Sequence, residues 1–205
     1  MALGTQYENI LPQDGEVYFV PAFLDEVEAE SYFHRLSMEI NWRQRPVVVF
    51  GRTVMQPRMT AWYADSGVSI HYSGLTELPK PWTPTLLTLK TRAEAWSGCS
   101  FNGVLLNLYR NGEDALGWHS DDEAYLGVSP VIVSLSFGAT RTCRFRHRLR
   151  QCHPVGVELT SGSLLLMRGQ TQRYWHHCVP KRKRVHAARI NLTFRWVHTN
   201  TNTTQ

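Results

Sequence analysis

The stretch Arg189-Ile-Asn191-Leu-Thr193-Phe-Arg195 alternates polar and apolar side chains over seven residues. Strict alternation predicts a β-strand, because successive side chains of a strand point to opposite faces of its sheet. One placement is the edge of a sheet, with the apolar face inward and the arginines in water. The other is the inside of a barrel, where buried arginines need an anionic partner. Because a planar guanidinium grips a carboxylate through two hydrogen bonds, a dicarboxylate would satisfy the second placement.

Short extended runs separated by turn residues surround this stretch. Beyond residue 101, strands are expected at 103–109, 131–137, 141–147, 155–160, 163–167, 175–179 and 188–197, a rhythm typical of a β-sandwich or barrel. Upstream, the sequence predicts an extended segment at 16–24, a strand within 46–51 that runs into a turn, two short strands between 57 and 72, and helices at 25–40 and about 83–97. Asp25 can cap the first helix.

Length and composition indicate one globular domain, or one domain with a cap. The chain has 205 residues, of which 42% are hydrophobic. It has no run of 18 apolar residues and no apolar signal core at the N-terminus, so a soluble intracellular protein is expected. The four cysteines have irregular spacing without a C-x-x-C pair. They are expected to be reduced, and a structural zinc site is not favoured.

Charge is distributed unevenly along the chain. Residues 1–40 carry eight acids and one base, whereas residues 141–195 carry thirteen Lys or Arg and one acid. Such a field favours a polyanionic partner, and nucleic acid is the commonest one. The alternative is an ordinary basic surface.

A histidine and a carboxylate stand two residues apart at His119 and Asp121. In extended backbone these positions point to the same side, so both can contact one ion. His177 follows 58 residues later in another strand-like run. Two histidines and one carboxylate form the facial triad of non-haem Fe(II) oxygenases, which leaves one face of the metal open. By itself, the spacing of His119 and Asp121 favours a surface His-Asp pair, because this motif occurs by chance in many proteins.

Asn107 and Tyr109 repeat the period of two just upstream of the triad. They would add an amide and a phenol to the pocket that holds Arg189, Asn191 and Arg195. A dicarboxylate such as 2-oxoglutarate would suit this pocket.

Over residues 46–197, these motifs occur in the order and spacing of the AlkB family of Fe(II)/2-oxoglutarate dioxygenases, and the chain resembles the DNA-repair homologues of that family. The resemblance implies an α+β, mainly β fold. Its core is a double-stranded β-helix (a cupin-like jelly-roll) with helices outside and an N-terminal nucleotide-recognition cap. The expected division is a scaffold and lid at 1–98, a catalytic core at 99–198 and a disordered tail at 199–205, all in one unit.

The resemblance implies direct reversal of alkylation damage by oxidative demethylation of bases such as 1-methyladenine and 3-methylcytosine. Fe(II), 2-oxoglutarate and O2 are consumed with release of formaldehyde, succinate and CO2. By carry-over, iron is held by His119, Asp121 and His177. His177 is preferred to His176 because the family places this ligand three residues before a proline, here Pro180. The co-substrate residues are Asn107, Tyr109, Arg189, Asn191, Thr193 and Arg195. Arg189 is expected to grip the distal carboxylate with Tyr109 and Asn191, and Arg195 to face the C1 end.

A damaged base must leave its stack to reach buried iron, so residues that replace or recognise it are expected. The resemblance makes Phe50 and Gly51 a wedge that fills the gap, although a core Phe is the alternative. The other substrate contacts implied are Arg58, Tyr63, Ile70, Tyr72, Asp122 and Glu123. Tyr72 would stack on the flipped base, and Ile70 departs from the family, which usually has tyrosine there. The acids Asp122 and Glu123 would favour a cationic methylated base.

Two basic segments are expected to contact the nucleic-acid backbone, which sets affinity and not sequence choice. Their residues are Arg141, His147 and Arg148 in one segment, and Arg182, Lys183 and Arg184 in the other. The second segment also fits a nuclear localisation signal or a solvated turn.

The expected partner is methylated DNA, single- or double-stranded, with RNA as a further candidate. A monomer without membrane contact is expected, in the cytoplasm of a bacterium or the nucleus of a eukaryote. Two rival hypotheses remain. One is a 2-oxoglutarate oxygenase acting on a protein or small molecule, and the other is a non-catalytic nucleic-acid-binding relative.

Overall fold

Two antiparallel sheets face each other in the computed structural model, which describes residues 7–49, 51–72 and 75–199. The major sheet has the strand order β1-β12-β9-β14-β7-β4, and the minor sheet has the order β11-β10-β13-β8. The major sheet consists of β1 (Glu16–Val20), β12 (Leu164–Arg168), β9 (Ile132–Gly138), β14 (Arg189–Arg195), β7 (Gly103–Tyr109) and β4 (Met59–Ala64). The minor sheet consists of β11 (Val155–Leu159), β10 (Arg141–His147), β13 (Trp175–Val179) and β8 (Leu116–His119).

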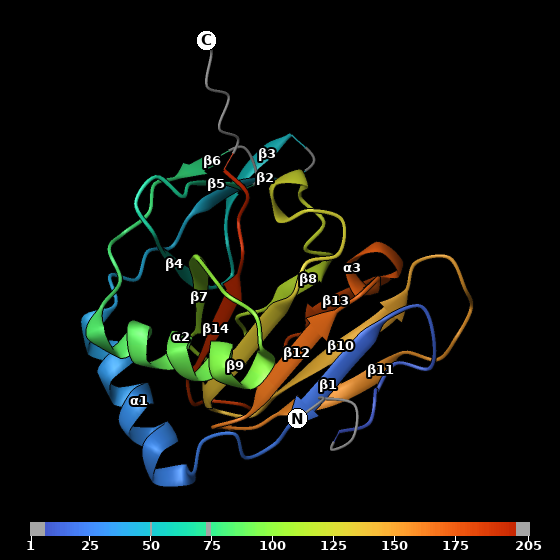
Figure 1. Ribbon diagram of the computed structural model, residues 1–205, viewed down its shortest axis with the longest axis horizontal. Helices are drawn as coiled ribbons and strands as arrows, with labels where there is room; N and C mark the ends of the chain where they lie inside the picture. Colours follow the sequence, from blue (N-terminus) through green and yellow to red (C-terminus); the bar gives the residue numbers. More distant parts are fainter. Residues whose placement is uncertain (1–6, 50, 73–74, 200–205) are drawn as a thin grey trace.

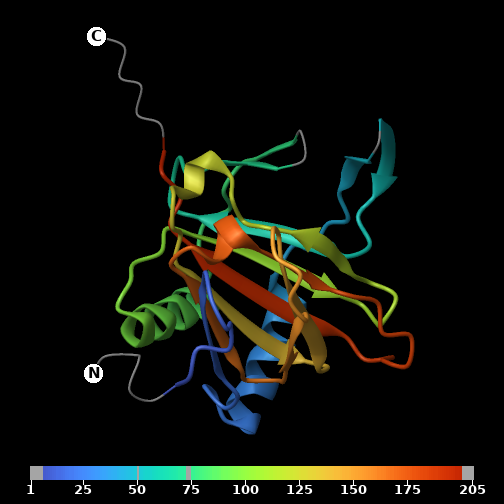
Figure 2. The same cartoon turned by 90° about the vertical axis from the view of Figure 1, so that its right-hand side faces the viewer.

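Helices and small hairpins flank these sheets. Helices α1 (Glu26–Glu39) and α2 (Pro84–Ser97) lie against the outer face of the major sheet, as Figure 1 shows. Two hairpins, β2 (Pro46–Val49) with β3 (Arg52–Met55) and β5 (Ile70–Tyr72) with β6 (Leu75–Glu77), project above the sheets (Figure 2). The short helices η2 (Ala124–Leu126) and α3 (Thr171–Tyr174) complete the described elements. None of the helices in these residues is long and apolar enough to cross a membrane.

Strand β14 lies inside the major sheet, paired with β7 on one side and β9 on the other. Its apolar residues Ile190, Leu192 and Phe194 belong to the core beneath the helices. Its polar residues point the opposite way, into a pocket between the two sheets. The edge-strand interpretation of this stretch is therefore wrong, because both faces of β14 are buried.

Local sequence explains the two long helices. Asp25 caps α1, where its side chain accepts from the N–H of Glu28 and the Glu28 carboxylate accepts from the N–H of Asp25. Thr83 caps α2, Pro84 occupies its first turn, and Gly98 ends it with φ 69°, a left-handed conformation that glycine adopts easily. Both helices and the strands expected beyond residue 101 are confirmed within one or two residues. Strands β3, β6 and β8 and the short helices η2 and α3 were not among the predicted elements.

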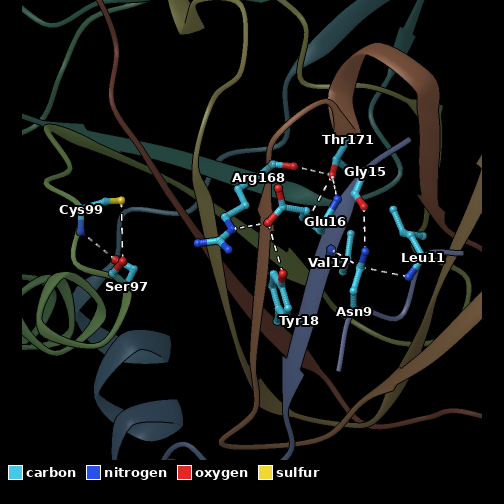
Figure 3. Close-up of polar contacts among 10 residues, drawn as sticks. All are labelled: Asn9, Leu11, Gly15, Glu16, Val17, Tyr18, Ser97, Cys99, Arg168 and Thr171. Atoms are coloured by element: carbon cyan, nitrogen blue, oxygen red, sulfur yellow. Dashed lines mark hydrogen bonds and ion pairs between the residues drawn. The ribbon is translucent and has the colours of Figure 1, made fainter. Parts of the chain in front are cut away.

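The first 98 residues share the core of the catalytic part, because β1 pairs with β12 and β4 pairs with β7. Figure 3 shows how side chains fix β1. The Glu16 carboxylate accepts from Arg168 at 2.7 Å and from Tyr18 at 3.2 Å, and the Thr171 hydroxyl accepts from the N–H of Glu16. Only the two hairpins stand apart from the sheets. Apart from Thr199, the expected disordered tail lies outside the described residues.

Candidate metal centre and co-substrate pocket

His119, Asp121 and His177 lie together, with one ligand atom from each residue within 4.8 Å of the others. Among residues 7–49, 51–72 and 75–199, no other group of three metal-ligating side chains is this close. His119 ends β8 and lies opposite His177 on β13, so strand pairing brings the two rings to a centroid distance of 4.2 Å. The neighbouring His176 lies on the other face of β13, because successive strand residues alternate.

Asp121 lies beyond the end of β8, so a continuing strand does not hold it beside His119. The loop is anchored to the α3 region instead. The Asp121 N–H donates to Oε1 of the buried Gln172 at 2.9 Å, and the Ser120 hydroxyl donates to the Trp175 carbonyl at 3.0 Å. Oε1 of Gln172 thus accepts the hydrogen bond that the carbonyl of a neighbouring strand would otherwise accept. No sequence pattern had pointed to Gln172.

The protonation states suit a divalent metal. Burial, reinforced by the neighbouring His119, lowers the pKa of His177 to about 3, so its imidazole is neutral. Burial alone would raise the pKa of Asp121, but the positive charge of the neighbouring Arg195 opposes this effect, and the pKa lies below its usual value. The Nδ1–H of His119 donates to the Gly117 carbonyl at 2.9 Å, which leaves Nε2 as the free lone pair beside Asp121.

A donor set of two imidazoles and one carboxylate fits Fe(II) in a facial triad. Nδ1 of His177 is buried and has no hydrogen-bond partner among the described residues. The three side chains therefore fit the predicted metal.

The triad forms part of the wall of a pocket between the sheets. Further residues lining it include Asn107, Tyr109, Arg189, Asn191, Thr193 and Arg195. Every co-substrate residue predicted from the sequence thus reaches the same cavity. The period of two along β7 and β14, which pair in register, explains this convergence.

The two arginines of β14 keep unused hydrogen-bond donors in this pocket. Arg189 donates from Nη2 to Ser136 at 2.9 Å, but its Nε and Nη1 have no partner in the described part of the chain. Nε of Arg195 is likewise without one, while its Nη2 lies 3.5 Å from Asp121. Burial lowers the pKa of Arg189, because the protein offers too little negative charge to offset the loss of water around its guanidinium. A dicarboxylate would supply the acceptors, so the pocket fits 2-oxoglutarate.

Arg141 lies behind this pocket and not on a nucleic-acid surface. Its buried guanidinium donates to the carbonyls of Asn111, Asp114 and Pro180 at 2.7–3.1 Å. It also lies 5.4 Å from the ring centroid of Tyr109, and Arg189 lies 5.2 Å from the same centroid. The predicted phosphate contact of Arg141 is corrected, because a side chain held inside the fold cannot reach a bound strand.

His147 requires the same correction. Its buried ring donates from Nε2 to Asp14 at 3.2 Å and accepts at Nδ1 from the N–H groups of Leu149 and Arg150. This histidine joins the N-terminal segment to β10. The other predicted backbone contacts are accessible: Arg148, which pairs with Asp122, and Arg182, Lys183 and Arg184.

The predicted substrate contacts separate into three groups. Arg58, Ile70 and Glu123 line the pocket, and Nε of Arg58 donates to Asn107 at 2.7 Å. Asp122 is exposed and turned toward Arg148, 3.0 Å away. Tyr63 lies on the opposite face of β4, where it belongs to the core beneath the helices and its hydroxyl accepts from the N–H of Asn41.

Most of the predicted wedge lies outside the described residues. Phe50 falls outside the described residues, and only the backbone of Tyr72 is placed, at the end of β5. Gly51 follows β2 with φ 74°, a turn conformation that favours glycine. Pocket residues that the sequence analysis missed include Leu105, Leu116 and Tyr125.

Comparison with known proteins defines the class. A family model described as the 2OG-Fe(II) oxygenase superfamily matches residues 16–195, so the chain belongs to that superfamily. It is 44% identical over 191 residues to alpha-ketoglutarate-dependent dioxygenase alkB homolog 3 of Bos taurus, covering 89% of this chain and 66% of that protein. With the human alkB homolog 3, identity is 42% over 203 residues, covering 94% and 70%. DNA oxidative demethylase ALKBH2 of Bos taurus is 42% identical over 178 residues, covering 82% and 64%.

Within the superfamily, the chain is a member of the AlkB family of dioxygenases. It spans about two thirds of the length of these curated relatives. A solved structure titled "The structure of OsALKBH1" superposes with a TM-score of 0.61 at 16% identity, covering 91% of this chain and 99% of that one. That likeness supports the jelly-roll fold. The resemblance and fold class predicted from the sequence are confirmed.

Proposed function

We propose that this protein is an Fe(II)- and 2-oxoglutarate-dependent demethylase that removes N-methyl groups from 1-methyladenine and 3-methylcytosine in DNA. The observation that carries the proposal is the triad of His119, Asp121 and His177 in one pocket with two arginines that keep unused donors. The relatives named as DNA oxidative demethylases support the same activity.

Bound iron, with 2-oxoglutarate and O2, would supply the oxidising power to hydroxylate an N-methyl group, which is then lost as formaldehyde while the co-substrate leaves as succinate and CO2. The protein positions the reactants. His119, Asp121 and His177 would hold the metal, and Arg189 would bind one carboxylate of the co-substrate beside Tyr109. Arg195, 3.5 Å from Asp121, keeps that carboxylate ionised at the metal.

A methylated adenine or cytosine carries positive charge, and the pocket wall presents a carboxyl group to it. Glu123 lines the pocket, and burial together with the neighbouring Asp121 raises its pKa. A cationic base beside Glu123 would stabilise the ionised carboxylate and so offset the unfavourable effects of burial and of Asp121. Glu123 therefore favours a methylated base over a normal one, whereas Asp122 is turned away toward Arg148.

The same bases occur in RNA, which is a second candidate substrate. We propose that the enzyme acts as a monomer, because the pocket of a single chain already contains the triad and the predicted co-substrate residues. The nucleus is the proposed compartment if the source is a eukaryote, and the cytoplasm if it is a bacterium.

The test measures formaldehyde and succinate release with single-stranded DNA, duplex DNA and RNA that carry 1-methyladenine or 3-methylcytosine, side by side. The proposal predicts release that requires both iron and 2-oxoglutarate with at least one DNA form. No release from any nucleic acid would contradict it and favour an oxygenase acting on a protein or small molecule.

A further inference from the structure

The outer face of the minor sheet carries a row of cationic and aromatic side chains directly behind the triad. Strand pairing places Arg146 on β10 opposite His176 on β13, and His177 opposite His119 on β8. Since successive residues alternate, His176 and Trp118 lie on the face opposite to the two metal ligands. We call Arg144, Arg146, His176 and Trp118 the Trp118 stripe.

The aromatic member of the stripe is open to solvent. Trp118 is 39% exposed, and the guanidinium of Arg146 lies 4.6 Å from the centroid of its ring. This contact holds the indole in place on the sheet and leaves part of its surface accessible. Aromatic residues and arginine are enriched at binding interfaces relative to the rest of the surface.

The charge of the stripe is positive and weakly compensated. Across the described residues, neither Arg144 nor Arg146 has a carboxylate within 4.0 Å, while the nearby acids are engaged elsewhere: Glu158 with Arg182 at 2.7 Å and Asp122 with Arg148 at 3.0 Å.

The stripe also adjoins the active-site pocket at the end of β8. Trp118 directly precedes His119, whose side chain is partly exposed and lines the pocket. Arg148 and Asp122 form an ion pair next to the stripe, just beyond the ends of β10 and β8. A polymer whose reacting unit enters the pocket can therefore lay its neighbouring units over this face.

We propose that the Trp118 stripe binds the nucleic-acid strand beside the lesion by stacking an unpaired base on Trp118 while the arginines contact phosphates. This inference rests on the proposed function and deepens it. An aromatic face beside cations suits unpaired bases, because every base has a stacking face and every linkage a negative charge. An acidic peptide would satisfy the arginines without using the indole, and a duplex keeps its base faces stacked inside.

The direct test is the intrinsic fluorescence of the protein titrated with an unmethylated 20-nucleotide oligothymidylate, which involves no turnover. Binding is expected to quench fluorescence. Trp118→Ala should lose much of that quench and weaken binding about tenfold, and Arg146→Ala should lower the salt dependence of affinity by about one phosphate contact. Trp96→Phe, on α2 behind the major sheet, and Arg35→Ala, exposed on α1, are matched controls that should bind as the native protein does.

Three results would overturn the inference: unchanged affinity and quench in Trp118→Ala, equal binding of a duplex, or equal quench by polyglutamate. Trp118→Tyr keeps an aromatic face and should restore most of the affinity. If Trp118→Ala is damaged in folding, its melting temperature will fall. In that case Trp118→Tyr decides: a Trp118→Tyr protein that melts like the native protein but does not restore binding contradicts stacking.

A second readout separates this inference from the proposed function. Trp118→Ala should turn over a methylated trinucleotide like the native enzyme but a methylated 20-mer about tenfold less efficiently at limiting substrate. If the native enzyme demethylates neither, the proposed function fails while the quench still reports on the stripe. Equal efficiency of Trp118→Ala and the native enzyme on the 20-mer overturns the stripe alone.

Discussion

Strands β14 and β3 have opposite surroundings. All seven residues of β14 are buried, and the strand is paired on both sides. All four residues of β3 are exposed, and the strand pairs only with β2. The polar side chains of β14 are held by hydrogen bonds before any ligand arrives, as Asn191 shows by donating to Ser134 at 2.7 Å.

The buried strand therefore serves the reaction, whereas the exposed hairpin serves the choice of substrate. The core provides a rigid site for metal and co-substrate, which every substrate must use. The hairpin of β2 and β3 exposes apolar residues such as Val54 and Met55. Changes in the core should therefore affect all substrates equally, and changes in the hairpin should affect some more than others.

The largest effect is expected from His177→Ala. Loss of a metal ligand should reduce demethylation of a methylated trinucleotide by about a thousandfold or more, with a matching loss of Mn2+ affinity, because the metal provides the reactive centre. His176→Ala is the matched control on the other face of β13 and should keep trinucleotide turnover. Equal losses in the two variants would mean that the wrong histidine has been assigned.

Arg189→Met should weaken the binding of 2-oxoglutarate. It keeps much of the side-chain volume but removes the charged donors, so the KM for 2-oxoglutarate should rise about thirtyfold or more while kcat falls less. Calorimetry of 2-oxoglutarate binding to the Mn2+-loaded protein checks the same loss without turnover. Arg184→Met, at an exposed position, should change neither value, and an unchanged KM in Arg189→Met would remove Arg189 from the co-substrate site.

Arg141→Met tests whether Arg141 supports the pocket from inside the fold or contacts nucleic acid at the surface. Leaving three carbonyls without their donor should lower the free energy of unfolding by about 2–3 kcal/mol and weaken 2-oxoglutarate binding several-fold. Oligonucleotide affinity should stay unchanged, because the side chain is buried. Denaturant unfolding and fluorescence titration measure the two quantities, and a loss of nucleic-acid affinity without a loss of stability would restore the surface role.

The smallest effect is expected from Phe50→Ala in the hairpin. Following the sequence-based wedge hypothesis, duplex demethylation should fall about fivefold while single-strand demethylation changes little, because only a duplex leaves a gap to fill. Rates on matched single- and double-stranded 20-mers measure this. Equal losses on both substrates would show that the hairpin supports the core and has no part in substrate choice.

The pattern of β14 and the order of motifs were enough to predict the fold and the pocket. Alternation told which side chains of β7 and β14 share a face, and all of them meet in the cavity. The same rule could have excluded Tyr63, because Arg58 and Tyr63 are five residues apart along an extended segment and so point to opposite faces. Strand parity was therefore informative along β4, β7 and β14, but not at Asp121, which lies beyond the end of β8.

Burial of charged side chains was harder to predict. Arg141 and His147 stand in a basic segment that looks solvent-exposed, yet tertiary contacts with residues distant in sequence draw both inside. Gln172 could not be identified either, since its role depends on where α3 meets the loop at Asp121. These contacts depend on how distant segments pack together, which no local pattern records.

The most direct test of the account measures formaldehyde and succinate together, with Fe(II), 2-oxoglutarate and a single strand carrying 1-methyladenine, in the native protein and in Asp121→Ala. The native protein should release one formaldehyde for each repaired base and at least one succinate. Asp121→Ala should release no formaldehyde, although that variant still binds the strand. Full formaldehyde release by Asp121→Ala, or none by the native protein with any methylated nucleic acid, would contradict the account.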